Sequence, residues 1–178
     1  MQTVIALGTF DGMHLGHRTV IARAVEEAAG LSARAIVYTF SSIPRALYSK
    51  APIMLMSPEE RKNEMLKMGV DEVIMVDFTK EVAGMSPEDF VSMLVREYHV
   101  CCVVAGEDYT FGYKAKGNMA LMKEMGKELG FQVVTVESVR VRMPDGSLGD
   151  KISSTDIRKA ISESRQELAD RLANGKYE

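Results

Sequence analysis

Gly8-Thr9-Phe10-Asp11-Gly12-Met13-His14-Leu15-Gly16-His17 is the stretch that decides the fold. It follows the apolar run Val4 to Leu7 and leads into an amphipathic helix that begins near His17. A strand, a glycine-punctuated turn and a helix start together bring free backbone N–H groups and the positive end of a helix dipole to one point, which favours phosphate. Because His14 and His17 are three residues apart, a helical turn projects both imidazoles to roughly the same side. The stretch therefore predicts a turn in which two histidines hold the phosphates of a nucleotide.

Two simpler interpretations of this stretch exist. A glycine-rich turn between a strand and a helix occurs in many α/β proteins for geometric reasons alone. A His-x-x-His pair also occurs as half of a metal site or as a surface pair. The coincidence of glycines, histidines and a first strand favours the nucleotide interpretation.

Length and composition indicate one globular domain. The chain of 178 residues is long enough to bury the core of one α/β domain, and 46% hydrophobic and 26% charged residues are ordinary for a soluble protein. No apolar run approaches the roughly 20 residues that span a bilayer, and no basic leader with a cleavage site precedes the first strand. We therefore expect a cytoplasmic protein that does not bind a membrane.

Charge and cysteine content exclude other classes. A net charge of −3, with positive residues confined to a few segments, disfavours nucleic acid as a partner and suits a small polyphosphate. The two cysteines, Cys101 and Cys102, are adjacent in an apolar run. Neighbouring side chains of a strand point to opposite faces, so we expect buried structural thiols and no disulfide, metal or catalytic role.

Hydrophobic periodicity predicts alternating strands and helices. After the first helix, ended by Gly30, a second strand completes a βαβ unit, which implies a parallel sheet. The pattern is typical of an α/β fold with an open parallel sheet and helices on both faces. Strands are expected at 33–40, 72–76, 100–105 and 131–136, and a hairpin-like segment at 139–147. Helices are expected at 57–68, from Ser86 onward and at 118–129, the first of them with Ser57 as N-cap and Glu60 in a capping box. A last helix is expected to be capped by Ser164 and ended by Asn174-Gly175.

Two loops follow the carboxyl ends of strands, where ligands bind in open α/β sheets. Residues 41–56 have no periodicity, and we interpret them as the segment that binds a second substrate or covers it; an ordinary connecting loop is the alternative. In the loop 106–117, Gly106 permits close approach of backbone, Asp108 is suited to accept ribose hydroxyls, and Phe111 is suited to pack a ring. The alternative for this loop is an Asp-capped turn with a core phenylalanine.

A second group of phosphate-binding residues occurs near the end of the chain. Ser153, Ser154 and Thr155 lie at a predicted helix start, where hydroxyl donors join free N–H groups. Arg158 follows one turn later and can bind phosphate in a bidentate manner. From these residues alone, a capping box with a solvated arginine is the favoured interpretation.

Several segments resemble one known family. Gly8 to His17 resembles the His-x-Gly-His signature of the nucleotidyltransferase superfamily, in the form found in bacterial FAD synthetases, the adenylyltransferase module of riboflavin kinase/FAD synthetase enzymes. Ile152 to Arg158 resembles the second nucleotide-binding signature of that superfamily, and residues 55–91 and 106–117 are similar to the middle of the module. The resemblance spans nearly the whole chain and implies a Rossmann-like nucleotidyltransferase fold.

The resemblance implies an FMN adenylyltransferase, which transfers AMP from ATP to FMN and gives FAD and pyrophosphate. ATP and FMN are then the small-molecule partners, with Mg²⁺ bridging the ATP phosphates and keeping most of its waters. The implied catalytic residues are His14, His17 and Arg158; the implied nucleotide-binding residues are Gly8, Phe10, Asp11, Gly106, Asp108, Ser154 and Thr155; and the implied flavin-binding residues are Phe40, Pro44 and Arg45.

The chain departs from the family in two places. After the second strand the family has a Thr-Phe-x-Pro-His-Pro-like stretch, whereas this chain has Thr39-Phe40-Ser41-Ser42-Ile43-Pro44-Arg45. Two alternatives therefore stay open: a nucleotidyltransferase with another phosphate acceptor, and a flavin- or nucleotide-binding module without turnover. Residues 1–178 are expected to form one domain without a riboflavin kinase domain. If the chain is complete, it can adenylylate FMN but not make it from riboflavin.

Overall fold

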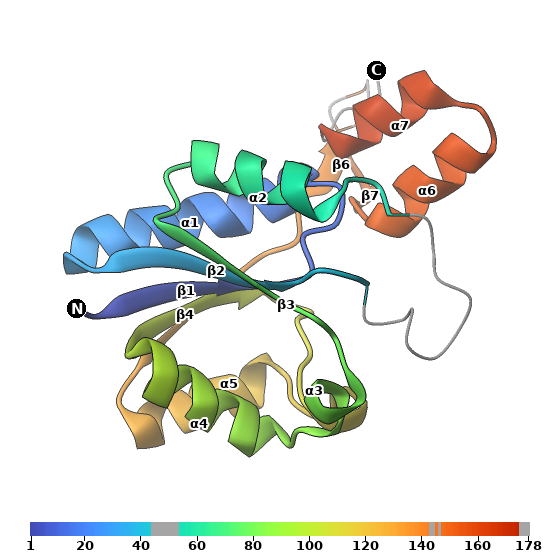
Figure 1. The fold of residues 1–178 in the computed structure, drawn as a ribbon. Helices are drawn as coiled ribbons and strands as arrows, with labels where there is room; N and C mark the ends of the chain where they lie inside the picture. The colour runs from blue at the N-terminus through green and yellow to red at the C-terminus, as the bar shows by residue number, and fades with distance from the viewer. Residues whose placement is uncertain (44–53, 143–144, 146, 175–178) are drawn as a thin grey trace.

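A computed structural model describes residues 1–43, 54–142, 145 and 147–174 of the chain (Figure 1). Strands and helices alternate over most of its length, as the hydrophobic pattern predicts. The strands are β1 (Thr3–Leu7), β2 (Arg34–Phe40), β3 (Glu72–Val76), β4 (Val100–Gly106), β5 (Gln132–Val136), β6 (Arg140–Arg142) and β7 (Leu148–Lys151). The helices are α1 (Leu15–Leu31), α2 (Pro58–Lys67), α3 (Lys80–Gly84), α4 (Pro87–Tyr98), the 3₁₀ turn η2 (Tyr113–Ala115), α5 (Met119–Leu129), α6 (Ser154–Ser162) and α7 (Gln166–Ala173).

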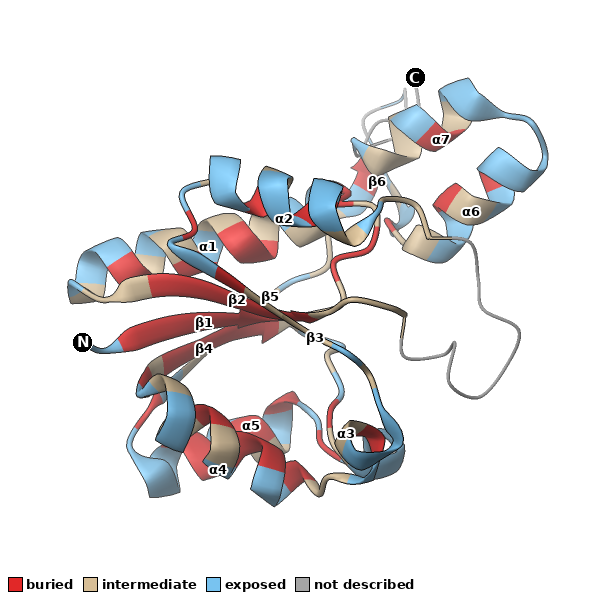
Figure 2. Cartoon of the chain, viewed as in Figure 1, coloured by how far each residue is buried: buried red, intermediate tan, exposed pale blue. Residues whose placement is uncertain are grey.

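The first five strands form one parallel sheet in the order β3-β2-β1-β4-β5. Strand β1 lies at its centre, and all five of its residues are buried (Figure 2). Val4 and Ala6 pack toward α1, while Ile5 and Leu7 pack toward α4 and α5. Alternate side chains of a strand face opposite sides, so this apolar run fills two core layers at once. The predicted open parallel sheet with helices on both faces is confirmed.

The order of the strands reverses direction at β1. The chain first adds β2 and β3 on one side of β1, with α1 and α2 over one face of the sheet, and then adds β4 and β5 on the other side, with α4 and α5 over the opposite face (Figure 1). The loops that leave β1 and β4 therefore diverge. In open α/β sheets, such a switch point at the carboxyl edge leaves a crevice where ligands bind.

The last part of the chain forms a small unit beside the carboxyl end of the sheet. Strands β6 and β7 pair as an antiparallel hairpin, and α6 packs against α7 (Figure 1). This unit has its own apolar cluster, which includes Val141, Ile152 and Ile157, and Leu55 packs against it. The hairpin-like segment expected near residues 139–147 is present.

Helix ends agree with the sequence where capping chemistry is strong. At α2, the Ser57 side chain accepts from the backbone N–H of Glu60 and the Glu60 carboxylate accepts from the N–H of Ser57, so the predicted capping box is confirmed. Helix α1 does not end at Gly30. It continues to Leu31, because Ser32 adopts the left-handed conformation that turns the chain into β2 and bonds through its N–H to carbonyls of the last turn.

Three further expectations need correction. Ser164 is a left-handed turn residue and not the cap of α7, whose N-cap is Arg165. Helix α3, capped by Thr79, was not predicted. Cys101 and Cys102 are both free, but they pack against the same core cluster, because the pairing of β1 with β4 shifts register at this point. The inserted residue removes the alternation of faces that a regular strand has.

Among the described residues, no helix is long and apolar enough to cross a membrane.

Gly112 is a position where only glycine fits. Its φ of +71° and ψ of −178° lie in a region open essentially to glycine, and a Cβ there would lie 2.6 Å from the backbone nitrogen of Pro87. Gly112→Ala is expected to lower the free energy of unfolding by about 1–3 kcal/mol, measured by urea denaturation. Gly84→Ala is the matched control, since its Cβ meets nothing within 4 Å. Similar losses in both variants would contradict this explanation.

Candidate active site

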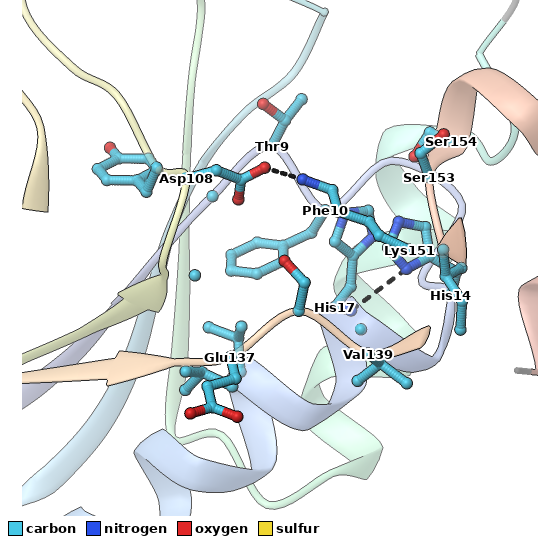
Figure 3. A pocket seen from close by; sticks show the side chains of 18 of the residues that line it. Thr9, Phe10, His14, His17, Asp108, Glu137, Val139, Lys151, Ser153 and Ser154 are labelled. Atoms are coloured by element: carbon cyan, nitrogen blue, oxygen red, sulfur yellow. Dashed lines mark hydrogen bonds and ion pairs between the residues drawn. The ribbon is translucent and has the colours of Figure 1, made fainter. Parts of the chain in front are cut away.

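A polar cavity of about 320 Å³ lies at the switch point, between the ends of β1 and β4 (Figure 3). The turn after β1 contributes His14 and His17, the loop after β4 contributes Asp108, and the unit of β6, β7, α6 and α7 contributes Lys151 and Ser154. Its volume is at the lower end of the range for small-molecule sites, roughly 300–1,000 Å³. Residues nearly 150 positions apart in the sequence thus meet in one cavity.

The two histidines are held against each other at the start of α1. His14 is the N-cap, and its Nδ1 accepts a hydrogen bond of 3.4 Å from the backbone N–H of His17. The two rings stack with their centres 3.5 Å apart, and Phe10 packs its ring at right angles to His17 at 5.6 Å. A Cβ on Gly8 would lie 2.7 Å from the Phe10 ring, so Gly8 leaves room for this packing.

Both imidazoles are neutral at physiological pH. The pKa of His14 is lowered from 6.5 to about 4, mainly by burial and to a smaller extent by the charge of Lys151, against the opposite effect of a backbone hydrogen bond. Burial lowers the pKa of His17 well below its usual value, and electrostatic interactions with His14, Arg61 and Arg158 act in the same direction. Because Nδ1 of neutral His14 accepts a hydrogen bond, its proton resides on Nε2, which is a donor for a phosphate oxygen.

The lowered pKa of His14 predicts a pH dependence of stability. In the unfolded chain the imidazole binds a proton near pH 6.5, but in the folded protein only near pH 4. The unfolded state therefore binds more protons between these values, so stability is full above about pH 6.5 and falls as the pH drops toward 4, by about 3 kcal/mol from His14. His14→Asn, which keeps a capping side chain, is expected to lose this contribution. If the free energy of unfolding falls by the same amount between pH 7 and pH 4.5 in the variant and in wild type, this pH dependence does not come from His14.

Asp11 joins three parts of the site. The residue is 3% exposed, its Oδ1 accepts a hydrogen bond of 3.1 Å from the N–H of Leu55, and its Oδ2 forms an ion pair with Arg158. Its backbone carbonyl accepts a hydrogen bond of 2.9 Å from the Ser154 hydroxyl. Asp11 therefore holds α6 and the segment before α2 onto the turn that follows β1.

A larger, aromatic cavity adjoins the polar one. Its volume is about 840 Å³. Thr9, Asp108 and Tyr109 line both cavities, so the two meet between the ends of β1 and β4. The rings that line the aromatic cavity are those of Phe40, Phe78, Phe90, Tyr109, Phe111 and Tyr113.

The structure brings most of the predicted site residues together. Phe40 lines the aromatic cavity, as the flavin prediction requires, and Phe111 lies there too, away from the polar cavity. Asp11, Thr155 and Arg158 are not among the residues that line either cavity. Pro44 and Arg45 lie outside the described residues. The predicted residues that line the polar cavity are Gly8, Phe10, His14, His17, Gly106, Asp108 and Ser154.

Sequence reasoning missed several residues of the site. Lys151 forms an ion pair with Asp108 across the polar cavity (Figure 3), and only its membership of a short basic segment pointed to it. The aromatic residues Phe78 and Tyr109 carry no motif of their own. Arg61 is completely buried below the site, although it follows two glutamates in what reads as a solvated first turn of a helix.

The donor set does not fit a metal ion bound by protein side chains. Over residues 1–43, 54–142, 145 and 147–174, no three histidine, cysteine, aspartate or glutamate side chains gather as ligands. Of the acidic side chains at the site, Asp11 pairs with Arg158 and Asp108 pairs with Lys151, so Glu137 is the one further carboxylate that lines the polar cavity among the described residues. Any Mg²⁺ here would accompany the phosphates of a nucleotide.

A parallel sheet with a histidine-bearing turn and a second helix start at its switch point defines an α/β protein of the Rossmann-like nucleotidyltransferase class. Residues 1–156 match the FAD synthetase family, and the chain belongs to this family.

Individual relatives agree with this membership. The chain is 36% identical over 180 residues to the bifunctional riboflavin kinase/FMN adenylyltransferase of Listeria monocytogenes. This alignment covers 99% of this chain and 55% of that protein. It is 31% identical over 172 residues to the enzyme of the same name from Escherichia coli K12, in an alignment that covers 95% of this chain and 53% of that protein. The chain spans about half the length of these curated relatives.

A solved structure shares the fold. The crystal structure titled as a macrolide-efflux protein from Streptococcus pneumoniae superimposes with a TM-score of 0.82 at 30% identity, over 97% of this chain and 55% of that one. The superposition extends over almost all of this chain, so the sheet and the carboxyl-terminal unit belong to one recurring arrangement.

Proposed function

We propose that the chain is an FMN adenylyltransferase, which transfers AMP from ATP to FMN and forms FAD and pyrophosphate. The observation that carries the proposal is the contact between the two cavities through Thr9, Asp108 and Tyr109. One cavity offers donors for a polyphosphate, and the other offers aromatic rings to a flat aromatic system. The membership of the FAD synthetase family supports the same substrates.

The proposed reaction requires little acid–base chemistry. An oxygen of the FMN phosphate attacks the α-phosphorus of ATP; the new P–O bond forms as the bond to the bridging oxygen of pyrophosphate breaks, and pyrophosphate leaves with that electron pair. The nucleophile is already an anion, so no proton has to be removed. Catalysis then consists of holding the two phosphates in line and stabilising the charge that develops on their oxygens.

The start of α1 provides the donors for this charge. His14 offers Nε2 as a donor, and Gly16 of the first turn of α1 lines the same cavity near the positive end of the helix dipole. His17 lies under His14 in the stack, and its Nδ1 is buried without a hydrogen-bond partner among the described residues. A buried polar atom of this kind is available to a ligand. We propose that both rings contact the phosphates of ATP.

The start of α6 supplies the second phosphate contact. The hydroxyl of Ser153 caps the helix at Asp156, and the hydroxyl of Ser154 donates to Asp11. We propose that the backbone N–H groups of this turn, with Thr155 and Arg158, hold the β- and γ-phosphates. For Arg158 this requires an exchange of part of its contact with Asp11 for a phosphate oxygen.

The remaining contacts follow from the two loops. Asp108 would accept the ribose hydroxyls near Gly106, and its ion pair with Lys151 would open or move to admit the nucleotide. The flavin ring would lie in the aromatic cavity beside Phe40, with Pro44 and Arg45 as further predicted contacts. Mg²⁺ enters the proposal only as the ion that accompanies ATP, and a cytoplasmic location is part of the proposal on sequence grounds.

The test is to incubate the purified protein with ATP and Mg²⁺ and with either FMN or riboflavin, and to separate the products by chromatography. FAD and pyrophosphate in equal amounts from FMN are expected. Binding of ATP without FAD formation would contradict the proposal. A product with another phosphorylated acceptor would then indicate a different nucleotidyltransferase, and binding of FMN without turnover would indicate a binding module.

A further inference from the structure

Arg61 is a buried cation beneath the two cavities. The residue lies on α2 and is 0% exposed. Its Nη1 donates to the carbonyl oxygen of Thr9 at 2.7 Å, and its Nη2 donates to the carbonyl oxygens of Phe40 at 2.9 Å and Ser41 at 3.0 Å. One guanidinium therefore joins the chain leaving β1 to the chain leaving β2.

A buried guanidinium bound to neutral carbonyls is costly for the fold. Transfer of a charged group from water into the interior is unfavourable unless hydrogen bonds and an opposite charge compensate. Burial lowers the pKa of Arg61, the nearby Asp11 carboxylate compensates only in part, and Nε has no hydrogen-bond partner among the described residues. Packing of α2 does not require this charge, since Met65, one turn further along, is completely buried against the core.

The carbonyls that Arg61 binds belong to residues of both cavities. Thr9 lines the polar and the aromatic cavity, and Phe40 lines the aromatic cavity. The hydroxyl of Thr39, itself fully buried, donates to the same Thr9 carbonyl at 3.0 Å. Since strands β1 and β2 are neighbours whose hydrogen-bonded ladder ends at Leu7 and Tyr38, these bonds continue the connection beyond the ladder.

We propose that Arg61 is a positioning residue, which fixes the polar cavity relative to the aromatic cavity and so aligns the two substrates for transfer. This inference rests on the proposed function. Arg61 touches neither substrate; it acts through the backbone of Thr9 and Phe40. A shift of about 1 Å between reacting atoms is enough to lower a rate by about 10²-fold, so a small displacement of these two chain segments has a large effect on turnover.

The inference predicts a particular kinetic pattern for Arg61→Met, which keeps an apolar side chain of similar length. Each cavity is formed largely by its own elements, so the dissociation constants of ATP alone and of FMN alone are expected to change by less than about 3-fold, whereas kcat falls by about 10- to 100-fold. Arg61→Lys keeps the charge and part of the hydrogen bonding, and is expected to restore part of kcat. Binding is measured by titration of one substrate in the absence of the other.

The matched control is Met65→Ala, on the same face of α2. It removes buried apolar contacts without touching the carbonyls of Thr9, Phe40 or Ser41, so it is expected to lower Tm at least as much as Arg61→Met while kcat stays within about 3-fold of wild type. Equal kcat values in Met65→Ala and Arg61→Met would overturn the proposal. Loss of binding of either substrate in parallel with kcat would also overturn it, because Arg61 would then support a single cavity.

If Arg61→Met does not fold, the proposal can still be tested with a variant of Thr39, whose hydroxyl binds the same Thr9 carbonyl as Arg61. Thr39→Val removes the second hydrogen bond to the Thr9 carbonyl, and kcat is expected to fall about 3- to 10-fold with little change in binding. Unchanged kcat in both Thr39→Val and Arg61→Lys would overturn the proposal. Wild-type protein that forms no FAD would contradict the proposed function as well, whereas active wild type with an unaffected Arg61→Met contradicts this inference alone.

Discussion

Replacing His14 by alanine is expected to lower the rate of FAD formation by about 10²-fold or more, as is typical when one donor to a developing negative charge is removed. The expectation follows from geometry and protonation together. The proton of neutral His14 resides on Nε2 because Nδ1 accepts from His17, and the ring lines the polar cavity. His17→Ala is expected to have a similar effect, since it removes the ring that supports His14 in the stack.

The role of His14 as a helix cap has to be separated from its proposed role in catalysis. His14→Asn keeps a capping side chain at the start of α1 but is too short to place a donor where Nε2 lies. It is expected to keep the stability of wild type at pH 7 and to lose the same 10²-fold in kcat. His99→Asn is the control, because His99 is a left-handed cap residue of α4, a conformation that asparagine tolerates, and lines neither cavity. A rate near that of wild type in His14→Asn would contradict the role of His14 as a phosphate donor.

The sequence predicts the features of this fold that depend on local pattern. The fully apolar run of β1 and the capping box at Ser57 and Glu60 each carry their own physical signal, and each is confirmed. The sequence predicts the end of α1 at Gly30, two residues before the chain turns, because the left-handed conformation that glycine more often supplies is adopted here by Ser32. Predictions of this kind fail where tertiary structure selects a conformation against local preference.

In the candidate site, too, continuous motifs can be predicted from the sequence, whereas features assembled by tertiary structure cannot. The histidine turn and the serine-rich helix start are continuous motifs, so the sequence reveals them. The aromatic cavity is assembled from single residues on separate elements, such as Phe40 at the end of β2, Phe78 after β3 and Tyr109 after β4, and of these three only Phe40 is predicted, through the family resemblance. Arg61 gives the clearest case: in the sequence its charge suggests solvent, whereas the structure buries it between two chain ends.

Asp11 and Arg158 connect the two sequence motifs, the histidine turn before α1 and the serine-rich start of α6. Neither residue lines a cavity, although both belong to the sequence motifs. Their ion pair, together with the bond from Ser154 to the Asp11 carbonyl, places the start of α6 against the start of α1. Under the proposed function, two helix N-termini then converge on one polyphosphate, whereas each alone would bind phosphate only weakly at a solvated surface.

Asp11→Asn is expected to lower the free energy of unfolding by about 3 kcal/mol, because it leaves the guanidinium of Arg158, whose side chain is only 20% exposed, without its buried carboxylate. The asparagine oxygen can still accept from the N–H of Leu55, so this hydrogen bond is not lost together with the charge. The affinity for ATP is expected to fall by about 10-fold, since α6 loses a fixed position relative to α1. Urea denaturation and ATP titration measure the two effects.

A double-mutant cycle with Arg158→Met isolates the interaction between the two side chains. Arg158 has contacts besides Asp11, so each single variant removes more than the pair, and only the coupling term reports on it. A coupling of about 2 kcal/mol is expected for this partly buried pair, against less than about 1 kcal/mol for the exposed pair of Arg34 and Glu72, whose side chains are 43% and 53% exposed. The exposed pair also lies far from both cavities in the register of the sheet, because it joins the amino-terminal ends of β2 and β3. Equal coupling in the two pairs would mean that burial adds nothing to the Asp11–Arg158 contact, and that the start of α6 is held in place by its apolar cluster and by the bond from Ser154 to the Asp11 carbonyl.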